Sequence, residues 1–224
     1  MTTFQRARSA EQREVRRRAI LDAAAGMLTE MPVAEVSLNE LSRRAGLAKS
    51  NVLRYFDSRE AVLLELLNSA WQEWLGQVDE ALAGIDAGAP AAERGDRLAA
   101  ALATSLASRP VLCDLLSAQA AVLERNVSPL VAAAFKRTAM ANVAALGRLI
   151  QACVGELGEH DSFRLAGATV LVAGAVWPSA HPSAAMLAAY QADPELAAMR
   201  LDFAATVREV LEVLISGLQA RSPR

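Results

Sequence analysis

The chain has 224 residues, 53% of them hydrophobic, and it carries a formal net charge of −2. This length and apolar content are enough to bury a core, which excludes intrinsic disorder. The chain has only two histidines and two cysteines, no phosphate-binding glycine loop and no nucleophile beside a base, which argues against an enzyme and against a bound metal or cofactor.

The composition, rich in alanine and leucine and poor in aromatic residues, favours helices over strands. Charge is unevenly distributed, because residues 1–60 carry a net charge of +3 and the remainder carries −5. A basic N-terminal part on an acidic body suggests that the N-terminal part meets a polyanion such as nucleic acid.

The N-terminal stretch "MTTFQRARSAEQREVRRRAI" is charged throughout and lacks the apolar centre of a secretory signal. The longest apolar run, residues 165–177, is too short to cross a bilayer and is expected to form a buried helix. We therefore expect a cytoplasmic protein with no membrane partner. Cys113 and Cys153 are expected to be buried free thiols.

Residues 11–30 predict the first helix, since apolar side chains recur at spacings of three and four from Ile20 to Leu28. The arginines between Arg6 and Arg18 leave two interpretations open. They form an arm along a DNA backbone or minor groove, or they belong to a solvated tail. A membrane-surface helix is a weaker alternative, because the apolar stripe is narrow and rich in alanine.

The next segment, "SLNELSRRAG", carries the start and stop signals of a short helix. Ser37 followed by Glu40 is a capping box, so the second helix is expected to begin at Leu38. Gly46 is a typical residue at a helix C-terminus and ends it. A third helix is expected over residues 49–56, with Val52 and Phe56 four positions apart on its buried side. Two short helices joined by a glycine turn are typical of a helix-turn-helix.

The exposed side of the third helix is expected to contact DNA. On a helical wheel, Ser50, Asn51 and Arg54 lie opposite Val52 and Phe56. Arginine suits guanine and asparagine suits adenine, whereas lysine, serine and tyrosine suit backbone oxygens. Lys49, Leu53 and Tyr55 flank this face.

After Asp57 and Ser58, which are cap residues, "REAVLLELLNSAWQEWL" begins a fourth, long helix. Further helices are expected between breaks at residues 83–95, 108–110, 129, 155–161, 178–183 and 192–194. The clearest apolar periodicity covers residues 130–154, 162–177 and 195–219. Gly167 and Gly174 permit close helix packing, which suits a subunit interface.

The segment "VSLNELSRRAGLAKSNVLRYFDSREAVLLELL" resembles the N-terminal domain of the TetR family of transcriptional regulators. The resemblance covers about residues 15–67, and it rests on the Gly46-Leu47 turn, the Tyr55-Phe56 pair and the following "SREAVL". It implies an all-α homodimer of about nine helices. Residues 1–57 would form the N-terminal arm and helix-turn-helix domain, and residues 58–224 the helical effector-binding and dimerisation domain.

The resemblance also implies which residues contact a double-stranded DNA operator: Ser37, Asn39, Arg43, Arg44, Lys49, Ser50, Asn51, Leu53, Arg54, Tyr55 and Arg59. Arg59 stands where the family usually has a phosphate-binding lysine. Leu53 departs from the family, because many members have tyrosine there. Leucine offers no hydroxyl to a phosphate or a base. Either it touches a thymine methyl group instead, or the neighbouring Arg54 takes over the lost contact.

For the body, the resemblance implies a homodimer through the last two long helices, about residues 162–177 and 195–219, and a small-molecule effector. Candidate pocket residues are Trp71, Trp74, Phe135, Met140, Trp177, His181 and Phe203, each of which has a plainer explanation as core or interface. Few charges lie near them, so the expected effector is mainly hydrophobic and its binding releases a repressor from DNA. The alternative is a DNA-binding regulator without an effector, controlled by a protein partner.

Overall fold

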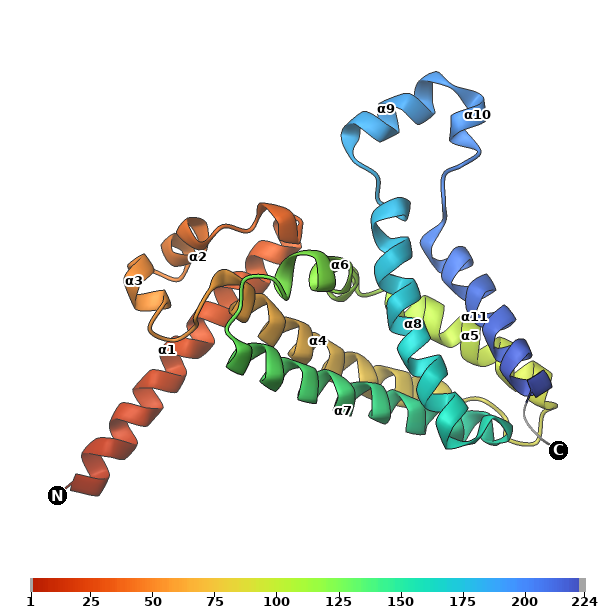
Figure 1. The fold of residues 1–224 in the computed structure, drawn as a ribbon, viewed down its shortest axis with the longest axis horizontal. Helices are drawn as coiled ribbons and strands as arrows, with labels where there is room; N and C mark the ends of the chain where they lie inside the picture. The colour runs from red at the N-terminus through yellow and green to blue at the C-terminus, as the bar shows by residue number, and fades with distance from the viewer. Residues whose placement is uncertain (1, 222–224) are drawn as a thin grey trace. The chain divides into compact units, whose positions relative to one another are not determined.

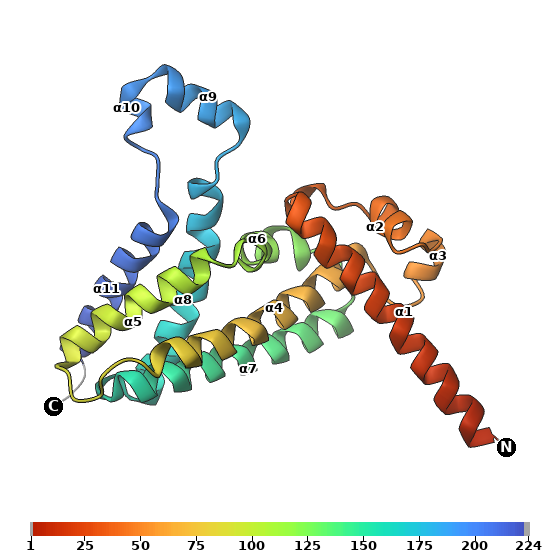
Figure 2. The same ribbon diagram turned by 180° about the vertical axis from the view of Figure 1, so that it is seen from behind.

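The computed structural model describes residues 2–221, with side chains from residue 11 onward, and within this range the chain is all-helical (Figures 1 and 2). The α-helices are α1 (Thr2–Glu30), α2 (Leu38–Arg44), α3 (Lys49–Val52), α4 (Arg59–Leu82), α5 (Ala91–Ala107), α6 (Pro110–Ala118), α7 (Pro129–Cys153), α8 (Gly158–Ala180), α9 (Ala184–Ala192), α10 (Pro194–Ala197) and α11 (Phe203–Arg221). Three shorter helical turns are η1 (Val33–Glu35), η2 (Gln119–Leu123) and η3 (Gly155–Leu157).

The chain divides into two compact units. Unit 1 contains the residues up to Leu67 together with Ala118–Phe135, and unit 2 contains Asn68–Ser117 and the residues from Lys136 onward. The sequence placed this boundary between residues 57 and 58. The division falls later because the first turns of α4 bury Val62 and Leu63 completely, and Asp57 accepts a 2.7 Å hydrogen bond from Ser128 within unit 1. Neither contact leaves a mark in the local sequence pattern.

In unit 1, α1 confirms the predicted apolar stripe, whose members Ile20, Ala24 and Met27 are fully buried. The helix is longer than predicted and its backbone continues to Thr2. The side chains of Arg6 and Arg8 lie outside the described residues.

Both predicted signals of α2 are confirmed. The Ser37 hydroxyl accepts a 3.1 Å hydrogen bond from the backbone N–H of Glu40. At the other end, Gly46 has φ +66°, the Gly46 N–H donates to the Arg43 carbonyl and the Leu47 N–H donates to the Ser42 carbonyl. This pair of bonds is a Schellman motif, which favours glycine because its left-handed backbone strains any residue with a Cβ. The motif fixes the direction in which the chain enters α3.

In unit 2, α11 packs against α5 and α8. A Cβ at Gly95 of α5 would lie 2.8 Å from a methyl carbon of Ile215, so only glycine permits this approach. The Gln219 side chain extends the contact by donating to the Ala91 carbonyl. Fully buried leucines from α5, α6 and α11 form the core around this contact: Leu98, Leu102, Leu106, Leu112, Leu115 and Leu211.

The long helix α8 differs from the sequence prediction in three ways. It begins at Gly158, inside the predicted break, and it continues through Pro178 to Ala180, so the break falls only at residues 181–183. A proline in the last turn removes a single helical hydrogen bond, which the helix tolerates. Residues 165–177, expected to form a buried helix, are buried on one side only, because Leu165, Val170 and Trp177 are buried whereas Leu171 is 76% exposed.

Gly155–Ala180 is the one straight helical stretch among the described residues that is long and apolar enough to cross a membrane, and a third of its most apolar window is buried. Its two interface glycines behave differently. A Cβ at Gly174 would lie 3.1 Å from the Leu116 carbonyl of the same chain, whereas a Cβ at Gly167 would meet open space. Close packing at Gly174 is therefore internal, and Gly167 faces outward.

The predicted helix over residues 195–219 is interrupted, because α10 ends at Ala197 and α11 begins at Phe203. The excursion formed by α9 and α10 leaves the ends of α8 and α11 (Figure 1) and contains no buried residue. At its base, the Trp177 and His181 rings stack at 3.7 Å and Phe203 packs edge-on against Trp177.

The predicted burial of the cysteines is confirmed for Cys113, where burial raises the thiol pKa to about 12. Cys153 is half-buried.

Candidate nucleic-acid interface

Helix α3 presents the predicted polar face, although it is shorter than expected. Only Lys49–Val52 is α-helical, and Arg54 and Tyr55 follow in a tighter turn whose N–H groups donate to carbonyls three residues back. Val52 and Phe56 are buried as predicted. Lys49, Ser50, Leu53 and Arg54 are exposed, whereas Asn51 and Tyr55 are half-buried. The face opposite the buried pair is therefore open to a large ligand.

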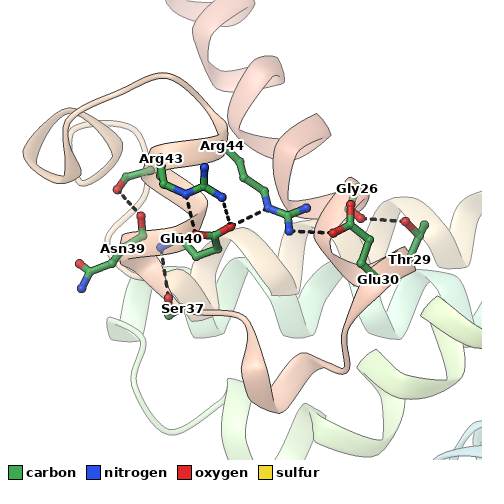
Figure 3. A network of polar contacts seen from close by, with 9 residues as sticks. Gly26, Thr29, Glu30, Ser37, Asn39, Glu40, Arg43 and Arg44 are labelled. Atoms are coloured by element: carbon green, nitrogen blue, oxygen red, sulfur yellow. Dashed lines mark hydrogen bonds and ion pairs between the residues drawn. The ribbon is translucent and has the colours of Figure 1, made fainter.

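Helix α2 carries a network of charges centred on Glu40 (Figure 3). One Glu40 carboxylate oxygen accepts hydrogen bonds from Arg43 at 2.6 Å and from Arg44 at 2.9 Å. Arg44 also donates to Glu30 of α1 at 2.7 Å. Ser37 and Asn39 lie beside this network, with both side chains exposed. The network ties α2 to α1 and restricts Arg44, whereas the Arg43 side chain remains largely exposed.

Hydrogen bonds from Arg43 and then Arg44 lower the pKa of Glu40 to about 2. Because this pKa lies below that of an unfolded glutamate, the pairing is complete at neutral pH and is lost as the pH falls toward 2. The pairs are exposed to solvent, so their contribution to stability is small. Their effect is positional, since they hold α2 at a fixed place on α1.

Arg59 and Arg17 are likewise engaged inside unit 1. The Arg59 guanidinium donates to the Val36 carbonyl and, at 3.1 Å, to Glu60. Arg17 pairs with Glu65 of α4 and lies 4.9 Å from the centre of the Phe56 ring. Both side chains connect the segments that support α3, so Arg59 has a supporting role that the sequence did not indicate.

A different set of cations has no carboxylate partner among residues 11–221: Arg13, Arg16, Lys49 and Arg54. Three of them line one cleft of about 440 Å³, together with Gln12 and Tyr55. The cleft joins the N-terminal half of α1 to the end of the α3 turn. Sequence reasoning named the α1 arginines and Arg54 separately, and nothing local in the sequence showed that they share a site.

The effector candidates do not form one group. Trp71 and Trp74 on α4 are buried, and the Trp74 indole N–H donates to Ser105 at 3.0 Å. Met140 is 64% exposed on α7, apart from the buried candidates. Phe135 is buried, but it belongs to unit 1. Trp177, His181 and Phe203 form the aromatic stack at the base of the α9–α10 excursion, and His181 Nδ1 lies 3.0 Å from the Trp177 carbonyl.

Sequence reasoning also missed four buried polar atoms in unit 2 that have no hydrogen-bond partner among residues 11–221: Asn68 Oδ1, Trp71 Nε1, Asn142 Nδ2 and Ser162 Oγ. One of these atoms could have been found from the sequence, because Asn142 stands on the apolar face of α7, between Phe135 and Leu146.

A helix-turn-helix with an exposed polar α3, joined to a helical body, defines the class of DNA-binding transcriptional regulators. Residues 20–66 match the family described as bacterial regulatory proteins, tetR family, and residues 68–222 match the tetracyclin repressor-like C-terminal domain. The chain belongs to the TetR family of transcriptional regulators.

Individual relatives agree with this assignment. The chain is 39% identical over 64 residues to the regulator EthR of Mycobacterium tuberculosis, which covers 29% of this chain and 28% of EthR. An uncharacterized HTH-type regulator of the same species is 41% identical over 54 residues, covering 24% of this chain and 27% of the relative. The aligned part thus spans less than a third of each relative.

Solved structures share the fold over nearly the whole chain. A TetR regulator from Rhodococcus sp. RHA1 has a TM-score of 0.58 at 14% identity, covering 96% of this chain and all of that one. FadR from Bacillus subtilis, solved with stearoyl-CoA, has a TM-score of 0.54 at 16% identity, covering 89% and 97%. These likenesses concern the fold alone.

Proposed function

We propose that this regulator binds a specific DNA operator through the exposed face of α3 and acts as a repressor in the cytoplasm. The observation that carries the proposal is that the rest of unit 1 holds α3 in a fixed orientation with its polar side exposed. Buried Val52 and Phe56 fix one side of the segment, the Schellman turn at Gly46 fixes its entry, and the opposite side offers uncommitted polar groups. A rigidly held polar face of this kind is what reading of base edges in the major groove requires.

We propose further that two copies bind one operator, joined through α8 and α11. Gly167 and Leu171 lie four residues apart on the outward side of α8, where Leu171 is 76% exposed, and Val213 of α11 is 67% exposed. Apolar side chains in the middle of long helices favour coverage by another helix pair. Two heads would then occupy half-sites roughly 34–36 Å apart, one helical turn of DNA.

The test is a Ser50→Ala/Asn51→Ala variant. Neither substitution changes charge, so electrostatic binding to random DNA should persist, whereas operator affinity should fall at least about tenfold because base contacts are lost. The operator is first selected from a random duplex library with the wild-type protein. Fluorescence anisotropy then compares operator with scrambled DNA, and Thr29→Ala on α1 is the control. Equal affinity of wild type and variant for the operator would remove α3 from base recognition.

For the effector, we propose a mainly apolar molecule with a hydrogen-bond acceptor, bound in unit 2 near Trp71 and Asn142. Both side chains are buried and present N–H groups without an acceptor. A buried polar group without a partner is costly, so an orphaned pair is a reasonable place for a ligand oxygen.

Trp71 lies on α4 and Asn142 on α7, and each precedes the last residue of its helix by 11 positions. Arg94 connects the segments that follow the two positions, because it donates to the Ala87 and Ala89 carbonyls after α4 and to the Cys153 carbonyl at the end of α7. The proposed ligand would bridge these two helices.

Two neighbouring tryptophans give a matched test. Trp74→Phe removes a made hydrogen bond and should lower the free energy of unfolding by about 0.5–1.5 kcal/mol more than Trp71→Phe, which removes an unpaired N–H. Chemical unfolding followed by circular dichroism measures both. Trp71→Phe should also blunt the release of operator DNA by effectors, for which stearoyl-CoA is the first probe, given its presence in the FadR structure. Equal destabilisation by the two substitutions would mean that the Trp71 N–H is already satisfied.

The second candidate is a regulator controlled by a protein partner, without an effector. The α9–α10 excursion favours it, because its exposed Met186, Met199 and Leu201 offer a surface to another protein. Operator release by a small molecule with purified protein alone would decide against this candidate.

A further inference from the structure

We infer that the cleft between α1 and the end of the α3 turn is a phosphate seat for the DNA backbone, in which Arg54 serves as a phosphate ligand and not as a base reader. The inference rests on the proposed function, because it assumes that the head binds DNA. It adds a second contact surface outside the α2–α3 motif, and of the contacts that the sequence leaves open for Arg54 it selects the one to phosphate.

The first observation is the distribution of free cations. In residues 11–67, five arginines are neutralised by carboxylates of the same chain, namely Arg17, Arg18, Arg43, Arg44 and Arg59. Arg13, Arg16 and Arg54 are exposed and have no such partner among residues 11–221. The three arginines of this segment that chain folding leaves unneutralised thus lie together, and an anion from outside is favoured there.

The second observation is the shape and lining of the place. Arg13, Arg16 and Arg54 surround a cleft of about 440 Å³ with Gln12 and the Tyr55 side chain, and none of the described residues that line it carries a carboxylate. Guanidinium, amide and phenol groups all donate hydrogen bonds, and a phosphate is an acceptor only. The volume exceeds what one phosphate needs, which suits a continuous sugar–phosphate strand.

The third observation is the position of the cleft relative to α3. Arg54 and Tyr55 follow the last α-helical residue, Val52, and their backbone continues directly from the face that holds Lys49 and Ser50. When that face enters a major groove, the groove wall beside its C-terminal end is a phosphate strand. Helix α1 then supplies Arg13 and Arg16 to the same strand as a rigid rod, since its helical backbone continues without a break to Thr2.

The seat sets affinity and leaves sequence preference to α3, because phosphates carry no base information. This yields a signature in the salt dependence of binding. Each phosphate contact contributes a slope of roughly −0.9 to the plot of log affinity against log salt concentration. Loss of the seat should therefore flatten the slope and weaken operator and scrambled DNA by the same factor.

The experiment compares wild type, Arg13→Gln/Arg16→Gln, Arg54→Gln and the triple variant by fluorescence anisotropy at several salt concentrations, on the selected operator and on scrambled DNA. The control is Arg18→Gln on the same helix, whose arginine already pairs with Asp22 at 3.1 Å. The double variant should flatten the slope by roughly 1–2. Arg54→Gln should flatten it by roughly 1, with the ratio of operator to scrambled affinity unchanged. The triple variant should lose less than the sum of the two, since the groups share one strand.

A second arm replaces single phosphates beside each half-site with neutral methylphosphonates. One such position should weaken the wild-type protein and leave the triple variant unaffected. The inference is overturned if the slopes of the variants equal that of the wild type, or if Arg54→Gln relaxes preference at one base position. A wild-type protein that shows no preference for any selected sequence would instead overturn the proposed function.

Discussion

Replacing Leu171 by arginine is expected to convert the proposed α8–α11 dimer into monomers and to weaken operator binding by about 100-fold or more. Leu171 lies in the middle of α8 and is 76% exposed in the single chain, on the same side as Gly167. A charge placed in a dry helix–helix interface has no partner there, and substitutions at the centre of an interface commonly cost several kcal/mol, at least about 2. A single head holds one half-site, so the second set of contacts is lost with the dimer.

Sedimentation equilibrium measures the association, and anisotropy measures operator affinity on the same preparations. Met140→Arg is the matched control, because Met140 is a similarly exposed apolar side chain on α7. The control should remain dimeric. A Leu171→Arg protein that sediments as a dimer would exclude the outward side of α8 from the subunit interface.

Features that depend only on residues close together in the chain, such as helix caps and buried helix faces, were predicted correctly from the sequence. Ser37 and Gly46 bound α2 because capping and left-handed turns are chemistry of the local backbone. Val52 and Phe56 were identified as buried because helical periodicity reports one face at a time. Helical periodicity also predicted an α3 that is too long, because it does not show that residues 53–55 form a tighter turn after Val52.

Contacts between segments that are far apart in the chain could not be predicted from the sequence. Arg44 seemed free for DNA until folding brought Glu30, 14 positions away, within 2.7 Å. Arg59 meets the Val36 carbonyl, which no charge pattern marks. Likewise, Arg13 and Arg54 share a cleft only because α1 crosses beside the end of the α3 turn. Which cations remain free for DNA is thus decided by the fold.

The interior candidates show the same limit. Aromatic residues were the natural choice for a pocket, yet Met140 points outward and Trp74 is satisfied by Ser105. The atoms that lack partners belong to Trp71 and Asn142, and their lack of partners is a property of packing alone. Composition gives the inventory of polar groups, and the fold decides which of them stay unsatisfied.

Truncation of Phe56 to alanine should remove DNA binding while leaving unit 2 folded. Phe56 is 5% exposed, closes the core beneath the α3 turn and carries Arg17 over its ring. Its loss should cost about 3–5 kcal/mol, because both transfer and cavity terms apply. Unit 1 is small, so the free energy of unfolding that it can lose without unfolding is also small.

Chemical unfolding followed by circular dichroism should show an early transition for the Phe56→Ala protein, and limited proteolysis should cleave residues 31–57 first. Sedimentation should still report the wild-type association state, since α8 and α11 belong to unit 2. Leu53→Ala is the control for stability, because Leu53 is 43% exposed only three positions away and its truncation should change the free energy of unfolding by no more than about 0.5 kcal/mol. Full operator affinity in a Phe56→Ala protein would mean that α3 keeps its position without this side chain. The Gly46 turn and Val52 would then be the features that hold α3 in place.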